Sequence, residues 1–237
     1  MISIFDHLSS ILIGTAVILV LMAAQFKSQH SGIEQVATHG VKAKTLVFGN
    51  WIERDILEIG KNLGLNRYRF KEPVTDSLGN TSRFHFFSDS TCTLGCSFPG
   101  GVNIAVGDTA RLHTRYKLMP TDRVELDTPD GPEERQLARL DREVAVTKVT
   151  NETAPDPTEA QWQSDLWSIG TLSFFNIRML DRFGRITNSV EQGDYIFVRF
   201  SVVPEWLLDP ENYIREIYWS TTLKIRPYWD PPTSASS

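Results

Sequence analysis

The chain has 237 residues, enough for one domain of ordinary size together with an anchor segment. Its net charge of -5 is mild and its 24 Lys and Arg residues are scattered, so no basic stripe points to nucleic acid as a partner. Motifs for a nucleophile elbow, a phosphate-binding loop, a zinc protease and a dinucleotide site are also absent, so we expect no enzyme, no catalytic residue and no cofactor.

Residues 8–24, LSSILIGTAVILVLMAA, form the one apolar run long enough to suit a lipid bilayer. As a helix rising about 1.5 Å per residue, the stretch from Ile2 to Ala24 reaches about 34 Å, against roughly 30 Å for a hydrocarbon core. A cleaved signal peptide is one alternative, but no Lys or Arg precedes the run and Ala24 is a poor cleavage position. A buried core helix is the other alternative, and it would need apolar neighbours on every side. The sequence predicts a transmembrane anchor over residues 1–26.

Asp6 places a carboxylate near the start of this apolar helix. Such a charge is expensive in lipid unless it is paired or lies near the interface. Asp6 can lie at the headgroup level, where it favours the positive end of the helix dipole, or it can neutralise the free α-amino group of a neighbouring anchor. If the anchors assemble, the predicted assembly residues are Phe5, Asp6 and Gly14.

Two cues to membrane orientation disagree. The first positive charges, Lys27, Lys42 and Lys44, follow the apolar run, so the positive-inside rule places that side in the cytoplasm. Cys92 and Cys96 suit an extracytoplasmic location instead. A disulfide closing their small loop is the favoured interpretation, because a redox site usually has two residues between its cysteines and a zinc site needs two more ligands.

Residues 27–65 continue the helix with amphipathic spacing. Apolar residues recur at every third or fourth position in two adjacent rows, which predict a broad stripe that packs on a sheet. The first row comprises Ile33, Val36, Gly40, Ala43, Val47 and Trp51, and the second comprises Ile52, Ile56, Ile59 and Leu63. The charged cluster of Glu53, Arg54 and Asp55 is interpreted as a solvated face, and Gly60 and Gly64 predict the helix end.

Residues 66–230 are rich in strand patterns and predict one globular domain. The expected strands are 67–70, 82–87, 102–106, 109–118, 144–149, 170–180, 194–203 and 218–225, with turn residues between them. We therefore expect an α+β fold in which an antiparallel β-sheet has one face covered by the amphipathic half of the long helix. Residues 151–163 read as an exposed loop, and residues 231–237 as a disordered tail.

Metal ligands are not evident in this domain. His85 and His113 are each a lone histidine in a strand run, for which a satisfied strand histidine is the favoured interpretation. The acidic stretch could hold Ca²⁺, but its spacing does not match an EF-hand and a solvated turn is simpler. This stretch comprises Asp122, Asp127, Asp130, Glu133 and Glu134. We expect no metal site.

Several segments together resemble type IV pilin-like proteins, in particular the large minor pilins and secretion pseudopilins. The resemblance is carried by the helix end at 51–56, the strands at 111–118 and 137–139, the late hairpin at 172–184 and 194–203, and the closing strand at 221–227. It implies a membrane-anchored helix packed on an antiparallel sheet, an N-terminus facing the cytoplasm and a domain outside it. Members of this family carry a short basic leader before a Glu at mature position five, whereas this chain starts at Met1 and has Asp6 near that place. The resemblance thus implies either a chain given in mature form or an uncleaved, divergent branch.

The expected function is that of a non-enzymatic, membrane-anchored pilin-like subunit of a type IV pilus or a type II secretion-like filament. Its expected partners are the lipid bilayer and other pilin-like or membrane-complex subunits, contacted through the N-terminal helix. Its expected location is the inner membrane, with a periplasmic or extracellular globular domain. The alternative is a single-pass accessory or binding subunit of a larger membrane complex or a membrane-containing virion.

Overall fold

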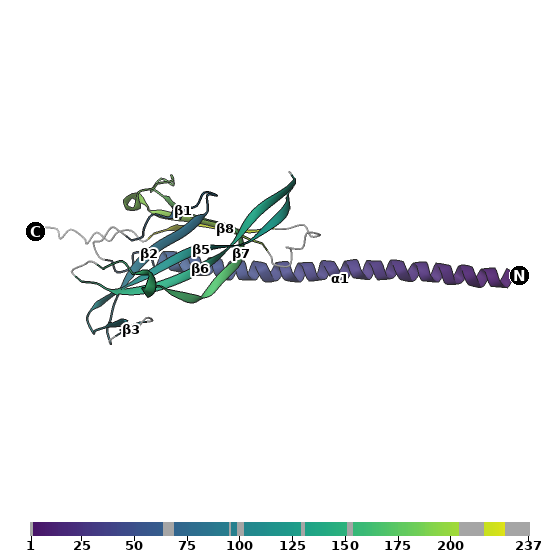
Figure 1. The fold of residues 1–237 in the computed structure, drawn as a ribbon, viewed down its shortest axis with the longest axis horizontal. Helices are drawn as coiled ribbons and strands as arrows, with labels where there is room; N and C mark the ends of the chain where they lie inside the picture. Colours follow the sequence, from purple (N-terminus) through teal and green to yellow (C-terminus); the bar gives the residue numbers. More distant parts are fainter. Residues whose placement is uncertain are drawn as a thin grey trace, which may run out of the picture. The chain divides into compact units, whose positions relative to one another are not determined.

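The computed structural model of the protein describes residues 2–63, 69–94, 96–98, 102–128, 131–150, 154–203 and 216–225, without the side chains of 2–9, 125–128, 132, 133 and 166–168. The chain divides into two compact units, Met1–Ala43 and Lys44–Ser237, and each is described by itself. The predicted fold class is confirmed, because a long N-terminal helix packs on a large antiparallel sheet (Figure 1). The predicted tail at 231–237 and Gly64 lie outside the described residues.

Helix α1 (Ile2–Leu57) ends earlier than the sequence predicts, and turns follow it over residues 58–62. Gly60 has a φ of +72° and Asn62 a φ of 59°, left-handed conformations that stop a helix. The Gly60 N–H donates to the carbonyl oxygen of Phe87 at 3.0 Å. The chain therefore leaves the helix to bond with the sheet, which explains why the predicted extension to residue 65 is wrong.

The sheet in the second unit has seven strands in the order β1-β2-β5-β6-β7-β8-β9, and every neighbouring pair is antiparallel. Strands β3 and β4 form a separate two-stranded sheet, and they lie between β2 and β5 in the chain. The strands are β1 (Val74–Thr75), β2 (Thr81–Thr91), β3 (Cys96–Phe98), β4 (Val102–Ile104), β5 (Thr109–Thr128), β6 (Gly131–Lys148), β7 (Gln163–Leu180), β8 (Tyr195–Val202) and β9 (Ile217–Lys224). Short 3-10 helices η1 (Glu159–Gln161) and η2 (Val190–Gln192) lie in two of the connections.

Strands β5 and β6 are much longer than predicted and form one hairpin that stays paired to Thr128 and Gly131. Arg123 and Glu134 in its outer part are exposed and lie 3.6 Å apart as an ion pair. Residues 131–136 of β6, GPEERQ, hold no apolar side chain, so this strand lacks the alternation that marks a buried face, although Val124 and Leu126 of β5 do alternate with charged residues. Cross-strand pairing, rather than burial, extends this hairpin, so the pattern in the sequence missed it.

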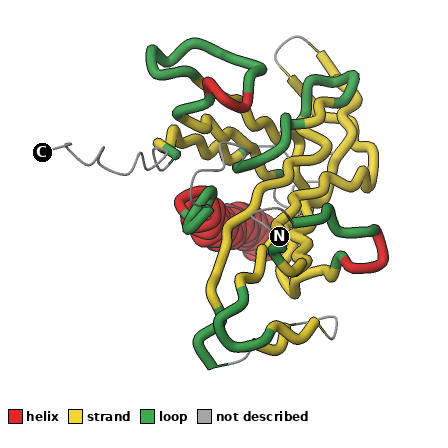
Figure 2. The backbone as a smooth tube through the Cα atoms, turned by 90° about the vertical axis from the view of Figure 1, so that its left-hand side faces the viewer, coloured by secondary structure: helices red, strands yellow, loops and turns green. Residues whose placement is uncertain are grey.

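The sheet is curled, so that β2 and β7 meet although two strands separate them in the sheet order. Strand β6 pairs with β7 only as far as Ala138 and Leu172. Beyond that point the Ile177 N–H donates to the Thr81 hydroxyl of β2 at 2.8 Å. Figure 2, which looks along the helix, shows strands above it and to its right, and in this unit the helix consists of its last turns. The curl gives the sheet a concave face against which one side of the end of the helix packs.

The core of the second unit lies between the last turns of α1 and the concave face of the sheet. The Phe48 and Phe200 rings meet edge to face with their centroids 5.1 Å apart, and Gly49 lies against the Trp219 ring. The second predicted row is confirmed, because all its members are buried: Ile52, Ile56, Ile59 and Leu63. The first row is wrong as a packing face, because four of its side chains are exposed: Ile33, Val36, Val47 and Trp51.

Candidate functional site

The apolar part of α1 is the largest functional feature of the first unit. Among the described residues, α1 is the one helix long and apolar enough to cross a membrane. No described residue covers its side chains, since Ile11 is 69% exposed and Val20 is 68% exposed. A helix that is apolar all round and uncovered by its own chain needs an apolar environment from elsewhere. The segment is therefore a candidate membrane span, and the alternative of a buried core helix does not fit it.

The predicted assembly residues all lie on α1. The side chains of Phe5 and Asp6 are outside the described part of the chain, so their roles remain predictions. At Gly14 an added Cβ would meet nothing within 4 Å, so the helix surface is open there. Small residues on an apolar helix allow a second helix to approach closely in a membrane.

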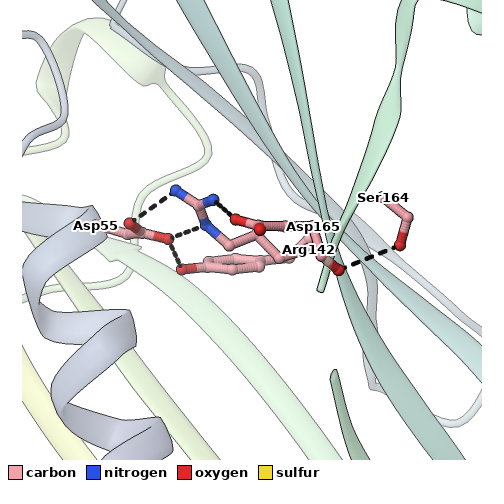
Figure 3. A network of polar contacts seen from close by, with 5 residues as sticks. Asp55, Arg142, Ser164 and Asp165 are labelled. Carbon is pink, nitrogen blue, oxygen red and sulfur yellow. Dashed lines mark hydrogen bonds and ion pairs between the residues drawn. The ribbon is translucent and has the colours of Figure 1, made fainter. Parts of the chain in front are cut away.

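The junction of helix and sheet holds a buried polar network that the sequence did not reveal (Figure 3). Asp55, in the last turn of α1, accepts a hydrogen bond from the Tyr116 hydroxyl of β5 at 2.6 Å. It also accepts two hydrogen bonds from the Arg142 guanidinium of β6, at 2.7 and 3.1 Å. Arg142 in turn donates to Asp165 of β7. One helix residue is thus bonded directly to β5 and β6, and through Arg142 it is linked to β7.

This network corrects the interpretation of residues 53–55 as a solvated face, because Asp55 is buried. A buried carboxylate is tolerated where its charge is paired and its oxygens accept hydrogen bonds, and Tyr116 and Arg142 meet both conditions. Burial and the neighbouring Asp55 carboxylate raise the pKa of the Tyr116 phenol well above its usual range. Burial alone would lower the pKa of Arg142, but the hydrogen bonds to Asp55 outweigh it and raise that pKa. Tyr116 therefore stays a neutral donor and Arg142 stays a cation. The network thus stabilises the attachment of α1 to the sheet, and we call it the lock at Asp55.

Cys92 and Cys96 form a disulfide in the structure, with their Cα atoms 5.6 Å apart. The described residues hold no free cysteine. Cys92 is fully buried in a small satellite core with Ile104, Ala110 and Val146. The bridge therefore fastens the start of β3 to the end of β2 and completes a local core.

His85 and His113 are buried, as expected of satisfied strand histidines, but they are not lone residues. His85 Nε2 lies 3.0 Å from His113 Nδ1, across the pairing of β2 with β5. His113 Nε2 lies 2.9 Å from the Thr147 hydroxyl of β6. Burial is the main cause that lowers the pKa of His85 to about 4, with the Lys71 charge adding to it. Burial and the neighbouring His85 lower the pKa of His113 to about 3, so both rings are neutral near pH 7.

In the part of the chain with described side chains, no group of three or more His, Cys, Asp or Glu residues is placed to hold a metal ion. Of the acidic stretch considered for Ca²⁺, Asp122 and Glu134 lie on the outer part of the β5 and β6 hairpin. The side chains of Asp127, Asp130 and Glu133 fall outside the described part.

Comparison with known proteins gives no identification. No family model matches the chain, and it has no significant match among curated proteins or solved structures. The case for a function therefore rests on the two features above: the exposed apolar helix and the locked junction between helix and sheet.

Proposed function

We propose that this protein is a non-enzymatic, membrane-anchored structural subunit of a pilin-like filament, of the type IV pilus or type II secretion kind. The observation that carries the proposal is the change of environment along α1. Its first part exposes an unbroken apolar surface, and its last turns are buried in an antiparallel sheet. One helix thus offers a surface for lipid or like helices and a fixed attachment for a folded domain.

The physical driving force is the removal of the exposed apolar surface from water. Burying apolar surface is worth about 25 cal/mol per Å². Side chains such as Leu12, Val17 and Leu21 are each more than half exposed, so either a bilayer or a bundle of identical helices would stabilise this segment. A filament subunit uses both environments, first the membrane and then the bundle.

The lock at Asp55 supports a structural role for the second unit. The hydrogen bonds that Tyr116 and Arg142 donate to Asp55 tie the helix to the sheet through charged or strongly polar groups, beyond apolar packing. A subunit held in an assembly by its helix needs its exposed domain fastened to that helix. The buried aromatic contact of Phe48 with Phe200 adds a second attachment.

The proposed location is the cytoplasmic membrane, with the sheet domain on its outer side. The Cys92 and Cys96 disulfide favours an oxidising compartment for that domain, because such bonds are rare in the cytosol. Asp6 would then lie near the inner face and pair with the α-amino group of a neighbouring subunit. Phe5 and Gly14 would lie in the helix contact.

The test uses cysteine cross-linking in the membranes of cells that make the protein. A single V17C substitution puts a thiol on the exposed apolar surface, and mild oxidation should give a ladder of many-subunit products. The matched variant combines V17C with D6A. It should stay in the membrane but give a shorter ladder, because the proposed pairing charge is lost.

The same experiment separates this proposal from an accessory subunit of a membrane complex. A single cross-linked product of fixed, small size would favour the accessory subunit and refute the filament. Deleting residues 2–26 should leave a soluble monomer that no longer assembles. A deleted form that still joins its partners would also refute assembly through the helix.

A further inference from the structure

A cavity of about 290 Å³ lies on the face of the sheet opposite α1. Strand residues alternate between the two faces, so Phe84 and Tyr116 point to the helix while Arg83, His85 and Arg115 point to the other side. Residues 71–74 and the connection before β7 provide the remaining walls. A volume near 300 Å³ is at the lower end of the range for small-ligand sites, which suits one ring-sized ligand.

Trp162 provides a flat apolar wall of the cavity. The Arg115 guanidinium lies 4.2 Å from the centre of its ring, and the His85 ring meets it edge to face at 5.1 Å. These contacts fix the orientation of the indole before any ligand arrives. Val74 and Pro157 add further apolar surface. A preoriented aromatic wall lowers the ordering cost of binding a ring against it.

The charges that line the cavity balance. Three cations, Lys71, Arg83 and Arg115, stand with an equal number of carboxylates, Glu72, Asp156 and Glu159. Lys71 pairs with Asp156 at 2.6 Å, and Arg115 with Glu159 at 2.8 Å. In the described part of the chain, Arg83 and Glu72 make no ion pair. A wall with balanced charge has no net attraction for an anion or a cation, yet it holds both donors and acceptors.

His85 adds a buried polar atom that has no hydrogen-bond partner among the described residues. The residue is 8% exposed and lines the cavity, and its Nε2 bonds to His113. Its Nδ1 makes no hydrogen bond to any described residue. If the Thr147 hydroxyl donates to His113 Nε2, the proton order along the chain makes His85 Nδ1 a donor. If His113 Nε2 donates to Thr147 instead, His85 Nδ1 becomes an acceptor.

We propose that this cavity binds a neutral, polyhydroxylated ring, namely a hexopyranose unit of a glycan. A sugar hydroxyl both donates and accepts, so it suits the reversible His85 chain in either proton order. Vicinal hydroxyls match the mixed donors and acceptors of Arg83 and Glu72, and the C–H face of the ring matches Trp162. The proposal does not depend on filament assembly, because every contact lies in the second unit.

The experiment is saturation-transfer NMR on the full chain in phospholipid nanodiscs. The probes are the methyl glycosides of glucose, galactose, mannose and N-acetylglucosamine, with glucuronate, methyl sulfate and choline as charged probes. At least one neutral glycoside should bind. Affinity should fall about fivefold or more in W162A, where the aromatic wall is lost.

Arg83→Gln tests the polar wall without touching an ion pair, and it should weaken binding by a similar factor. The matched controls are R185Q and W51A, which remove an exposed arginine and a half-exposed tryptophan elsewhere. Both controls should bind like the wild type. Circular dichroism confirms that each variant is folded.

Three results would overturn the proposal. One is that no neutral glycoside binds the folded wild-type chain. Another is binding of a charged probe alone, whether glucuronate, methyl sulfate or choline, which would make the cavity a site for an ion. The last is glycoside binding that W162A and R83Q leave unchanged, which would place the sugar elsewhere on the molecule.

Discussion

Two parts of the same helix reverse the usual link between polarity and burial. Residues 10–26 of α1 are almost wholly apolar and are exposed, whereas the last turns bury Asp55 beside Ile52 and Ile56. In the first part the apolar surface is uncovered by the part of the chain that the structure describes. In the second part a curled sheet supplies both apolar contacts and exact polar partners for the carboxylate.

The contrast shows that burial depends on what surrounds a residue, and that polarity alone does not decide it. A charged group can enter a core when its hydrogen bonds and its counter-charge enter with it. An apolar run can remain uncovered when its solvent is lipid or a like helix.

The largest effect is expected from D55A at the helix and sheet junction. The substitution leaves the Arg142 guanidinium and the Tyr116 hydroxyl buried without their common acceptor. Breaking one side of a buried pair costs about 3–5 kcal/mol, so the free energy of unfolding of the sheet domain should fall by that amount. Denaturant titration followed by tryptophan fluorescence measures it.

The matched control is E53A, two residues earlier in the same helix. Surface substitutions away from special features usually change stability by no more than about 0.5 kcal/mol. Equal losses in D55A and E53A would mean that the junction network contributes nothing beyond a generic surface charge.

The next effect concerns the membrane and uses V17R in the first part of α1. An arginine at the centre of a spanning helix costs about 2.5–3.5 kcal/mol in apparent insertion free energy. The carbonate-resistant membrane fraction should therefore drop sharply. Val47, also more than half exposed, lies in the second unit, so V47R should leave that fraction unchanged. Equal membrane retention of V17R and the wild type would argue against residues 10–26 as the span.

A smaller effect separates two glycines of α1 by their surroundings. An added Cβ at Gly49 would lie 2.4 Å from the Trp219 ring, whereas at Gly40 it would meet nothing within 4 Å. Overpacking typically costs about 1–3 kcal/mol, so G49A should destabilise the domain. G40A should instead favour the helix by up to about 1 kcal/mol, because alanine has the higher helix propensity. Thermal unfolding followed by circular dichroism measures whether each substitution raises or lowers the stability. A stabilising G49A would contradict the close contact with Trp219.

Much of the fold could be predicted from local patterns in the sequence. The apolar run marked the candidate span, and the row Ile52, Ile56 and Ile59 marked the face that packs on the sheet. The neighbouring row failed because Val47 and Trp51 have the same helical spacing but face away from the sheet core. Helical period shows that a stripe exists, yet only the position of the sheet decides which of two adjacent rows is buried.

The polar site could not be predicted, because its contacts join residues far apart in the chain. Asp55 meets Tyr116 and Arg142 across separations of 61 and 87 residues. His85 meets His113 only through the register of β2 with β5. The local sequence around the charged triplet in the helix predicts a solvated face, and the local sequence around each histidine shows no partner for it. A single sequence carries no signal for the register of two strands or for the partner of a polar side chain.

The mildest prediction uses acid to separate the two parts of the molecule. Burial lowers the pKa of His85 to about 4 and that of His113 to about 3, while an unfolded histidine titrates near 6.5. Above pH 6.5 both states are neutral and the stability is fully present. As the pH falls from 6.5 toward 4, these histidines bind protons in the unfolded chain but not in the folded sheet, so the free energy of unfolding decreases.

The loss should be on the order of 1 kcal/mol per histidine by pH 5.5, seen as a lower denaturant midpoint for the sheet domain. H85Q removes one of these groups and should flatten the slope between pH 6.5 and 4.5. The membrane fraction should not change over this range, because the histidines lie in the sheet and residues 10–26 carry no titrating side chain. A slope identical in H85Q and the wild type would assign the acid response to other groups.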